Sequence, residues 1–178
     1  MKKLKTNELG RLSIEAYKKT AKIPVIVVFD NIRSMHNVGS IFRTCDAFNI
    51  QKVILCGITP VPPHREINKT ALGATESVAW EYNSSVVNAI EKLQSTSYQI
   101  VGLEQADQSI PINQYIAAKD ENIALVIGNE VSGLSDEIME MLDICLEIPQ
   151  YGTKHSLNVS VAAGILIYEV CRSYFTIK

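Results

Sequence analysis

Short apolar runs separated by amphipathic segments constrain the fold of this chain more than any other feature of its sequence. The run Pro24–Asp30 reads PVIVVFD and the run 122–127 reads NIALVI, and neither alternates between apolar and polar residues. Such runs are typical of strands that are covered on both faces. Further strands are expected at 52–56, 78–82, 98–103 and 144–148. Since amphipathic segments separate the strands, we expect an α/β domain with a mainly parallel sheet and helices on both faces.

Capping residues and the spacing of apolar side chains locate the predicted helices. We expect helices at 6–20, from Asn37 to about 48, at 65–72, from Ser84 or Ser85 to 93, from Ser135 to about 141 and from Ser156 to about 174. We divide the chain into an N-terminal helical extension, residues 1–22, and a main domain, residues 23–178.

Composition narrows the class of protein further. The chain has 178 residues, of which 47% are hydrophobic, and a formal net charge of −2, which excludes disorder as the dominant state. No apolar run approaches the roughly 20 residues that a membrane span needs. The polar residues that follow Met1 do not fit a secretory signal. We therefore expect a cytoplasmic protein that does not enter a membrane.

Cysteine and histidine usage predicts neither a disulfide nor a metal site. The cysteines form no CxxC pair and have mostly apolar neighbours, which is typical of reduced thiols in or near a core. The histidines are too scattered to suggest a set of metal ligands. These residues are Cys45, Cys56, Cys145, Cys171, His36, His64 and His155.

Charge is distributed unevenly along the chain. Residues 1–69 carry 12 Lys and Arg against 5 Asp and Glu, whereas residues 70–178 carry 5 against 14. A basic half can contact an anionic polymer even when the whole chain is slightly acidic. The alternative is that the N-terminal lysines only solvate a helix, and charge alone does not decide between the two.

Three polar loops follow predicted strands, at the edge where parallel sheets bind ligands. Their ranges are 30–43, 128–135 and 149–160, and none contains a GxxxxGK[ST], GxGxxG or GxSxG motif. In the last loop we expect Asn158 to be buried on an apolar helix, where an unpaired amide costs about 1–3 kcal/mol. Capping, a surface ion pair and ordinary turns are the alternatives for the polar residues of the loops.

Taken together, the three loops resemble the motifs of the SpoU/TrmH-type RNA ribose 2′-O-methyltransferases of the SPOUT superfamily. The first motif is N-x-G-x-x-x-R, here Asn37, Gly39 and Arg43. The second is G-x-E-x-x-G-L, here from Gly128 to Leu134, and the third is I-P-x-x-G-x-x-x-S-L-N-V-S-V-A, here 148–162. The resemblance covers about residues 24–175. One departure is Gln150-Tyr151, where methionine commonly follows the proline.

The resemblance implies a fold, a cofactor and an assembly. The fold is an α/β domain whose C-terminal part forms a deep trefoil knot, and the protein is a homodimer with active sites across the interface. S-adenosyl-L-methionine is the methyl donor, and RNA, either tRNA or rRNA, is the acceptor. Many relatives carry a separate RNA-binding domain before the core, and residues 1–22 are too short to replace one. The residues implied to line the cofactor site are Leu103, Gly128, Ile148 and Leu157.

The resemblance also implies the catalytic region, which comprises Arg43, Asn37, Glu130, Ser156 and Asn158. Proposals for the family make the arginine a base, but a neutral guanidinium is expensive because its pKa is very high. Our hypothesis is that Arg43 holds a substrate phosphate and stabilises the negative charge that develops on the ribose oxygen. Basic residues that could contact RNA phosphates are Lys18, Lys19, Lys22, Arg33, Arg65 and Lys69.

Two other classes of function stay open at this point. One is a non-catalytic RNA-binding or assembly protein that keeps the SPOUT fold, and the other is an unrelated α/β enzyme that acts on a small molecule. The motif residues Asn37, Arg43 and Glu130 are all present, which favours the enzyme.

Overall fold

The computed structural model describes residues 1–5, 8–119 and 121–175. Within these ranges, strands form one parallel sheet in the order β3-β2-β1-β6-β4-β7-β5. The strands are β1 (Ile23–Asp30), β2 (Ile50–Cys56), β3 (Trp80–Asn83), β4 (Gln99–Leu103), β5 (Ile110–Pro111), β6 (Ile123–Ile127) and β7 (Ile144–Glu147).

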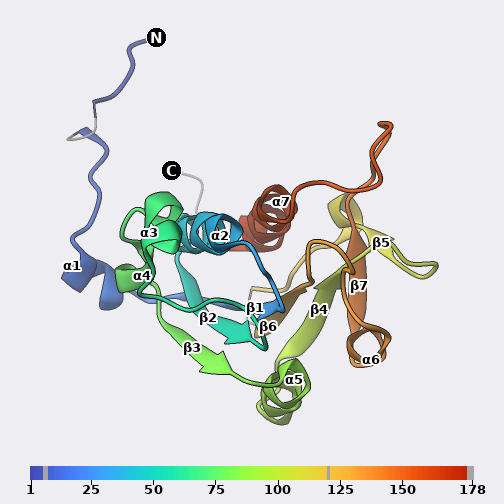
Figure 1. Ribbon diagram of the computed structural model, residues 1–178. Helices are drawn as coiled ribbons and strands as arrows, with labels where there is room; N and C mark the ends of the chain where they lie inside the picture. Colours follow the sequence, from blue (N-terminus) through green and yellow to red (C-terminus); the bar gives the residue numbers. More distant parts are fainter. Residues whose placement is uncertain (6–7, 120, 176–178) are drawn as a thin grey trace.

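Helices cover the sheet on both faces, as the sequence predicts (Figure 1). One face carries α2 (Met35–Ala47), α3 (Arg65–Ala71) and α7 (Val159–Cys171), and the other carries α5 (Val86–Ser95) and α6 (Asp136–Met139). The remaining helical segments are α1 (Ile14–Lys18), α4 (Ala74–Ser77) and the short 3-10 helices Ile112–Gln114 and Arg172–Tyr174. The expected α/β architecture is therefore confirmed.

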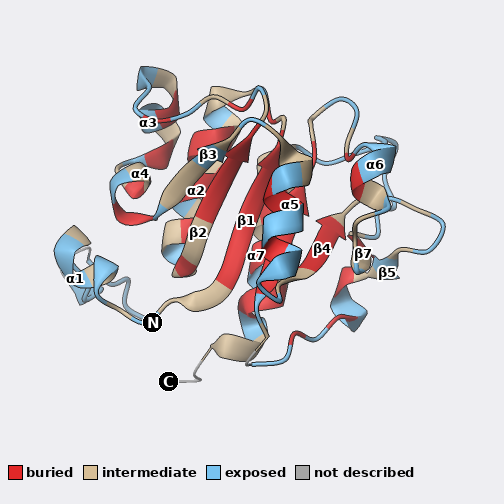
Figure 2. Cartoon of the chain, turned by 90° about the horizontal axis from the view of Figure 1, so that it is seen from below, coloured by how far each residue is buried: buried red, intermediate tan, exposed pale blue. Residues whose placement is uncertain are grey.

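The core lies on the two faces of the central strands, which Figure 2 shows as the buried middle of the sheet. Val25, Val27 and Phe29 of β1 belong to the cluster that packs against α2 and α7. The alternate residues Ile26 and Val28 belong to the cluster that packs against α5 and α6. Strands that are buried on both faces need apolar residues at every position, which explains the unbroken run in the sequence.

The cysteines are free thiols, as expected. Burial raises the pKa of the Cys56 thiol to about 12, and it raises the pKa of the Cys171 thiol to about 12 as well. A thiol with so high a pKa holds almost no thiolate at neutral pH, so these two side chains act as small apolar groups in the core.

Several predicted boundaries are wrong. The first helix covers only 14–18 instead of 6–20, because Ser13 caps it and accepts a hydrogen bond from the Ala16 N–H; residues 6 and 7 lie outside the described residues. Its apolar residues Leu9 and Leu12 are exposed, so no core surface favours a longer helix. Both α4 and β5 were missed in the sequence, since four and two residues are too few to show a periodicity.

The order of the strands does not test the trefoil knot, which stays a prediction. Among the residues that the structure describes, no helix has the length and apolar character needed to cross a bilayer.

Helices α2 and α3 approach each other closely at Gly39, which is fully buried between them. A Cβ at this position would overlap the carbonyl oxygen of Ile67 and the hydroxyl of Thr70. The Thr70 hydroxyl also donates a hydrogen bond of 3.0 Å to the carbonyl oxygen of His36. The missing side chain of Gly39 therefore fixes the distance between the two helices.

We expect Gly39→Ala to lower the free energy of unfolding by about 1–3 kcal/mol, because the new methyl group meets backbone that cannot move away. The measurement is urea denaturation followed by circular dichroism. Ser40→Ala, at the next position of the same helix, is the control and should change stability by less than about 0.5 kcal/mol. Equal stability of Gly39→Ala and the wild type would contradict the close contact.

Candidate functional site

A cavity of about 390 Å³ opens at the carboxyl ends of β4, β6 and β7. In the sheet, β4 lies between β6 and β7. The three loops that follow these strands form its walls, and the start of α7 closes one side. Parallel sheets expose backbone groups at this edge, and ligands of α/β proteins bind there. The volume lies within the range of small-molecule and cofactor sites.

All four residues implied to bind a cofactor line this cavity. Leu103 is the last residue of β4, Gly128 and Ile148 directly follow β6 and β7, and Leu157 precedes α7. Ile127 adds a further apolar surface. The sheet thus brings together residues that are far apart in the sequence.

The loop after β6 folds back on itself over the cavity. Asn129 and Gly133 exchange two backbone hydrogen bonds of 2.9 and 3.1 Å, and the Asn129 side chain accepts from the N–H groups of Val131 and Ser132. Gly133 has a φ of 65°, which favours glycine. A Cβ on Gly128 would overlap the backbone of Gly133. The lack of a side chain at Gly128 therefore allows the two ends of the loop to touch.

Glu130 connects this loop to the start of α2. One carboxylate oxygen accepts hydrogen bonds from the Ser34 N–H at 3.0 Å and the Asn37 side-chain amide at 2.9 Å. The other accepts from the Arg33 N–H at 3.0 Å. Burial raises the pKa of Glu130, but the donors from Arg33, Asn37 and Ser34 outweigh this effect, and the net pKa lies below the ordinary value.

Asn37 also links α2 to α7. Its side-chain oxygen accepts a hydrogen bond of 3.2 Å from the Asn158 side-chain amide. Asn158 in turn accepts from the N–H and the hydroxyl of Ser160. The three motif residues Asn37, Glu130 and Asn158 therefore form one network, although more than 90 residues separate Asn37 from either partner.

The structure corrects two expectations about these asparagines. Asn37 does not cap its helix: Ser34 is the N-cap of α2 and accepts from the Asn37 N–H at 3.3 Å, which leaves the Asn37 amide free to reach Glu130. Asn158 is exposed rather than buried, because α7 begins at Val159 instead of Ser156 and Asn158 is its N-cap. The capping role therefore accounts for a polar residue at position 158, although its side chain is not buried.

The remaining two residues of the implied catalytic region lie differently. Ser156 is exposed and lines the cavity. Arg43 does not line it; the side chain is exposed and borders a separate hollow between α2 and α3. Within one chain, the structure therefore joins the cavity to Asn37, Glu130, Ser156 and Asn158 but leaves Arg43 outside.

Glu104 and Asn129 are residues of the site that the sequence analysis missed. The Glu104 carboxylate accepts from the Leu134 N–H at 3.0 Å and fills the space where a Cβ of Gly133 would lie. The Asn129 amide donates to the carbonyl oxygen of Asn31 at 2.6 Å. Their positions directly after β4 and β6 were a usable signal, since polar residues at strand ends gather at the same edge.

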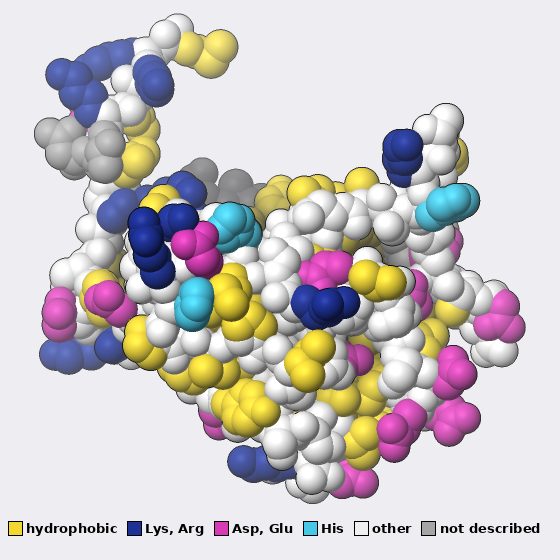
Figure 3. Space-filling view, in the orientation of Figure 1, with side chains coloured by type: hydrophobic (Ala, Val, Ile, Leu, Met, Phe, Trp, Pro, Cys, Tyr) yellow, Lys and Arg dark blue, Asp and Glu magenta, His cyan; other side chains and the backbone are white. Residues whose placement is uncertain are grey.

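Charge at the site is mainly negative. The acidic residues Glu104, Glu130 and Glu147 line the cavity together with His155. Figure 3 shows acidic side chains toward the α6 side of the molecule and basic side chains gathered over α3, which agrees with the uneven charge along the chain. No group of three potential metal ligands occurs in the described part of the chain. A ligand with a positive charge and an apolar body fits the lining.

The chain belongs to the SpoU rRNA Methylase family, which matches residues 24–168. A tRNA (guanosine(18)-2'-O)-methyltransferase of Aquifex aeolicus is 36% identical over 154 residues, which are 83% of this chain and 69% of that protein. A protein of Staphylococcus saprophyticus named as a TrmH family tRNA/rRNA methyltransferase is 34% identical over 85% of this chain. This chain spans 59% of the length of that relative.

Solved structures share the fold. The A. aeolicus TrmH/SpoU tRNA modifying enzyme matches with a TM-score of 0.79 and 29% identity over 90% of this chain and 80% of that chain. The AdoMet-bound rRNA methyltransferase from Sinorhizobium meliloti matches with a TM-score of 0.81 and 26% identity over 90% of this chain and 61% of that chain. The SPOUT fold implied by the sequence motifs is therefore confirmed at the level of the overall architecture.

We expect Glu130→Gln to destabilise the protein by about 1–2 kcal/mol at pH 7, because hydrogen bonds to a charged acceptor are lost or weakened. The folded pKa of Glu130 is lowered, so its stabilising contribution is complete above the ordinary carboxyl pKa of about 4.3 and is lost as the pH falls through the lowered value. Urea denaturation from pH 7 to pH 3 should show the gap between wild type and variant closing in acid.

Glu91→Gln, which changes an exposed carboxylate on α5, is the matched control for this titration. It should leave the stability of the protein nearly unchanged at every pH. A gap for Glu130→Gln that stays constant down to pH 3 would contradict the proposed charge on the Glu130 side chain.

Proposed function

We propose that this protein transfers a methyl group from S-adenosyl-L-methionine to a ribose 2′-hydroxyl of tRNA or rRNA. The observation that carries the proposal is the single network of Glu130, Asn37 and Asn158, which joins all three motif loops beside one cavity that two of these loops line. The name of the A. aeolicus relative, at 36% identity, supports the ribose oxygen as the acceptor. A 2′-hydroxyl exists only in RNA, so the acceptor polymer follows from the chemistry.

The cavity suits the proposed methyl donor in size and charge. Leu103, Ile148 and Leu157 provide apolar walls for an adenosyl group, and Gly128 leaves backbone groups exposed to it. The carboxylates that line the cavity complement a sulfonium. When bound, the cofactor would supply a methyl group on a good leaving group, so positioning in line with the acceptor contributes much of the catalysis.

The acceptor is a poor nucleophile until its proton leaves, and this defines the task of the residues around it. We assign to Arg43 the binding of a substrate phosphate and the stabilisation of negative charge on the ribose oxygen. Asn37, Glu130 and Asn158 act as positioning residues, because they contact one another and hold the loops in place. Ser156 lies at the cavity and would contact the ribose.

A second copy of the chain would complete the site. Arg43 lies outside the cavity of its own chain, and α7 exposes Val161, Ile165 and Tyr168, which are 52%, 38% and 50% accessible. A helix that is apolar on all sides is ordinarily covered. We propose a homodimer through this helix, in which Arg43 of one copy serves the cavity of the other.

The test of the function is transfer of a radiolabelled methyl group from S-adenosylmethionine to bulk tRNA and to rRNA that lack the modification. A 2′-O-methyl group blocks alkaline cleavage, so the label should appear in dinucleotides after alkaline hydrolysis. Label in mononucleotides would show methylation of a base and overturn the ribose assignment. RNA binding without any transfer would favour a non-catalytic RNA-binding or assembly protein.

We expect Arg43→Ala to reduce turnover by about 100-fold or more, because the developing charge loses its partner. The affinity for S-adenosylmethionine, measured by calorimetry, should change by less than about twofold, since Arg43 does not line the cavity. Turnover within a few-fold of the wild type would remove Arg43 from the mechanism.

Mixing two inactive variants tests whether the site crosses the interface. Gly128→Ala should close the cavity through overlap with Gly133, whereas Arg43→Ala leaves the cavity intact. Dimers with one copy of each variant would hold one complete site, so an equal mixture should recover about a quarter of the wild-type activity. No recovery after subunit exchange would show that each chain uses its own Arg43.

A further inference from the structure

A second hollow, of about 430 Å³, lies between α2 and α3, apart from the cofactor cavity. Two cationic side chains border it, Arg43 from α2 and Lys69 from α3. The other polar residues at its wall carry hydroxyl groups, and they are Ser40, Thr44 and Thr70. None of the described residues that line this α2–α3 hollow is acidic. Guanidinium, ammonium and hydroxyl groups are the side chains that bind phosphate oxygens in nucleic-acid complexes.

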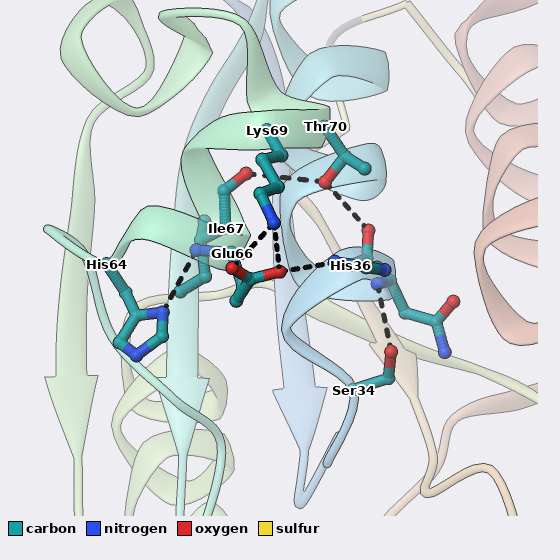
Figure 4. A network of polar contacts seen from close by, with 8 residues as sticks. Ser34, His36, His64, Glu66, Ile67, Lys69 and Thr70 are labelled. Atoms are coloured by element: carbon teal, nitrogen blue, oxygen red, sulfur yellow. Dashed lines mark hydrogen bonds and ion pairs between the residues drawn. The ribbon is translucent and has the colours of Figure 1, made fainter.

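The helix segments that carry the two cations are held at a fixed separation by the close contact between α2 and α3. Gly39 allows α3 to rest on α2, and the Thr70 hydroxyl bonds to the carbonyl oxygen of His36. Figure 4 shows Lys69 and Thr70 on the α3 side of this contact and His36 at the start of α2. Two donors on helices in fixed contact are better suited to one anion than two donors on segments that move independently, because less entropy is lost on binding.

Both cations are available to a ligand. The Arg43 side chain makes no hydrogen bond or ion pair with any residue that the structure describes. Lys69 lies 2.7 Å from one oxygen of Glu66 and 2.8 Å from the other, and His36 lies 3.0 Å from the same carboxylate (Figure 4). The Lys69 and Glu66 side chains are 50% and 35% accessible, and exposed ion pairs contribute little to stability. A phosphate can therefore replace Glu66 as the partner of Lys69 with only a small loss of free energy.

The lysines near the N-terminus fit an RNA contact less well. The Lys22 ammonium is 3.1 Å from the centre of the Tyr17 ring and 2.8 Å from Asn49 Oδ1, so it is engaged in the fold. Burial lowers the pKa of Lys22, while the nearby Asp46 carboxylate raises it. Lys18 and Lys19 are exposed, but neither borders a hollow that contains other donors.

We propose that the α2–α3 hollow binds a phosphodiester group of the RNA backbone through Arg43 and Lys69. The choice of RNA as the source of the phosphate rests on the proposed function. Because Asn37 lies on the same helix as Arg43, a phosphate in the hollow sets the position of the RNA strand relative to the motif network. Lys69 is thereby a substrate-binding residue outside the three sequence motifs.

Lys69→Gln tests the subsite in the full-length protein, with bulk tRNA as the probe. Loss of one phosphate contact should weaken Kd by about fivefold at 0.1 M salt and reduce the slope of log Kd against log salt concentration by about 0.7–1. Lys92→Gln removes the same charge from α5, on the opposite face of the sheet, and should leave Kd and slope unchanged. Equal changes of Kd and slope in the two variants would show that only the total charge of the protein matters, which would overturn the proposal.

Glu66→Gln provides a second test with the opposite sign. It removes the carboxylate that pairs with Lys69 and His36, so the affinity for tRNA should rise by about two- to fivefold. A variant that only disturbed the fold would weaken binding, not strengthen it. Unchanged or weaker binding by Glu66→Gln would contradict an anion subsite at this place.

The same variants separate the subsite from the proposed reaction. If tRNA binding depends on Lys69 but no RNA accepts a methyl group, the proposed function is wrong and the subsite stands. If methyl transfer proceeds and Lys69→Gln leaves Kd and KM for tRNA unchanged, the subsite is wrong and the function stands. If Lys69→Gln instead dissociates a dimer in sedimentation experiments, the hollow holds a carboxylate of a second copy, which also overturns the proposal.

Discussion

The arrangement of the site depends on one carboxylate, that of Glu130, which accepts three hydrogen bonds from the start of α2. The donors and the acceptor are 93 to 97 residues apart in the sequence. They meet because β1 and β6 are parallel neighbours, so the loops that follow these strands leave the same edge of the sheet. Two of the donors are backbone N–H groups of Arg33 and Ser34, which only a substitution by proline would remove.

The amide of Asn37 extends this link to the third loop. An amide side chain can donate and accept at the same time, and Asn37 donates to Glu130 while it accepts from Asn158. Asn158 in turn caps α7. The position of α7 is thus coupled to the loop after β6 through two side chains, and a carboxylate or a hydroxyl at position 37 could not provide both bonds with the same geometry.

The sequence predicted the sheet well because the central residues of β1 and β6 are buried on both faces and are all apolar. It failed where two good capping residues lie close together, as with Ser34 and Asn37, because tertiary partners decide which side chain caps the helix. The four residues that we propose bind the cofactor were predicted from the family motifs. The polar loops alone predicted only an edge of the sheet where a ligand binds. The place of Arg43 could not be predicted, since it depends on which side of α2 faces the loops.

Helix geometry explains why Arg43 lies apart from the cavity. Six residues separate it from Asn37, which corresponds to about 600° of helix rotation, so the two side chains point in directions about 120° apart. A single copy of α2 therefore cannot aim both side chains at Glu130 and Asn158 beside the cavity. If the cavity and the α2–α3 hollow belong to one reaction, as proposed, the RNA must pass the start of α2 or a second chain must bring its own α2. The close contact at Gly39 then matters for chemistry as well as stability, because it fixes where the phosphate lies relative to Asn37.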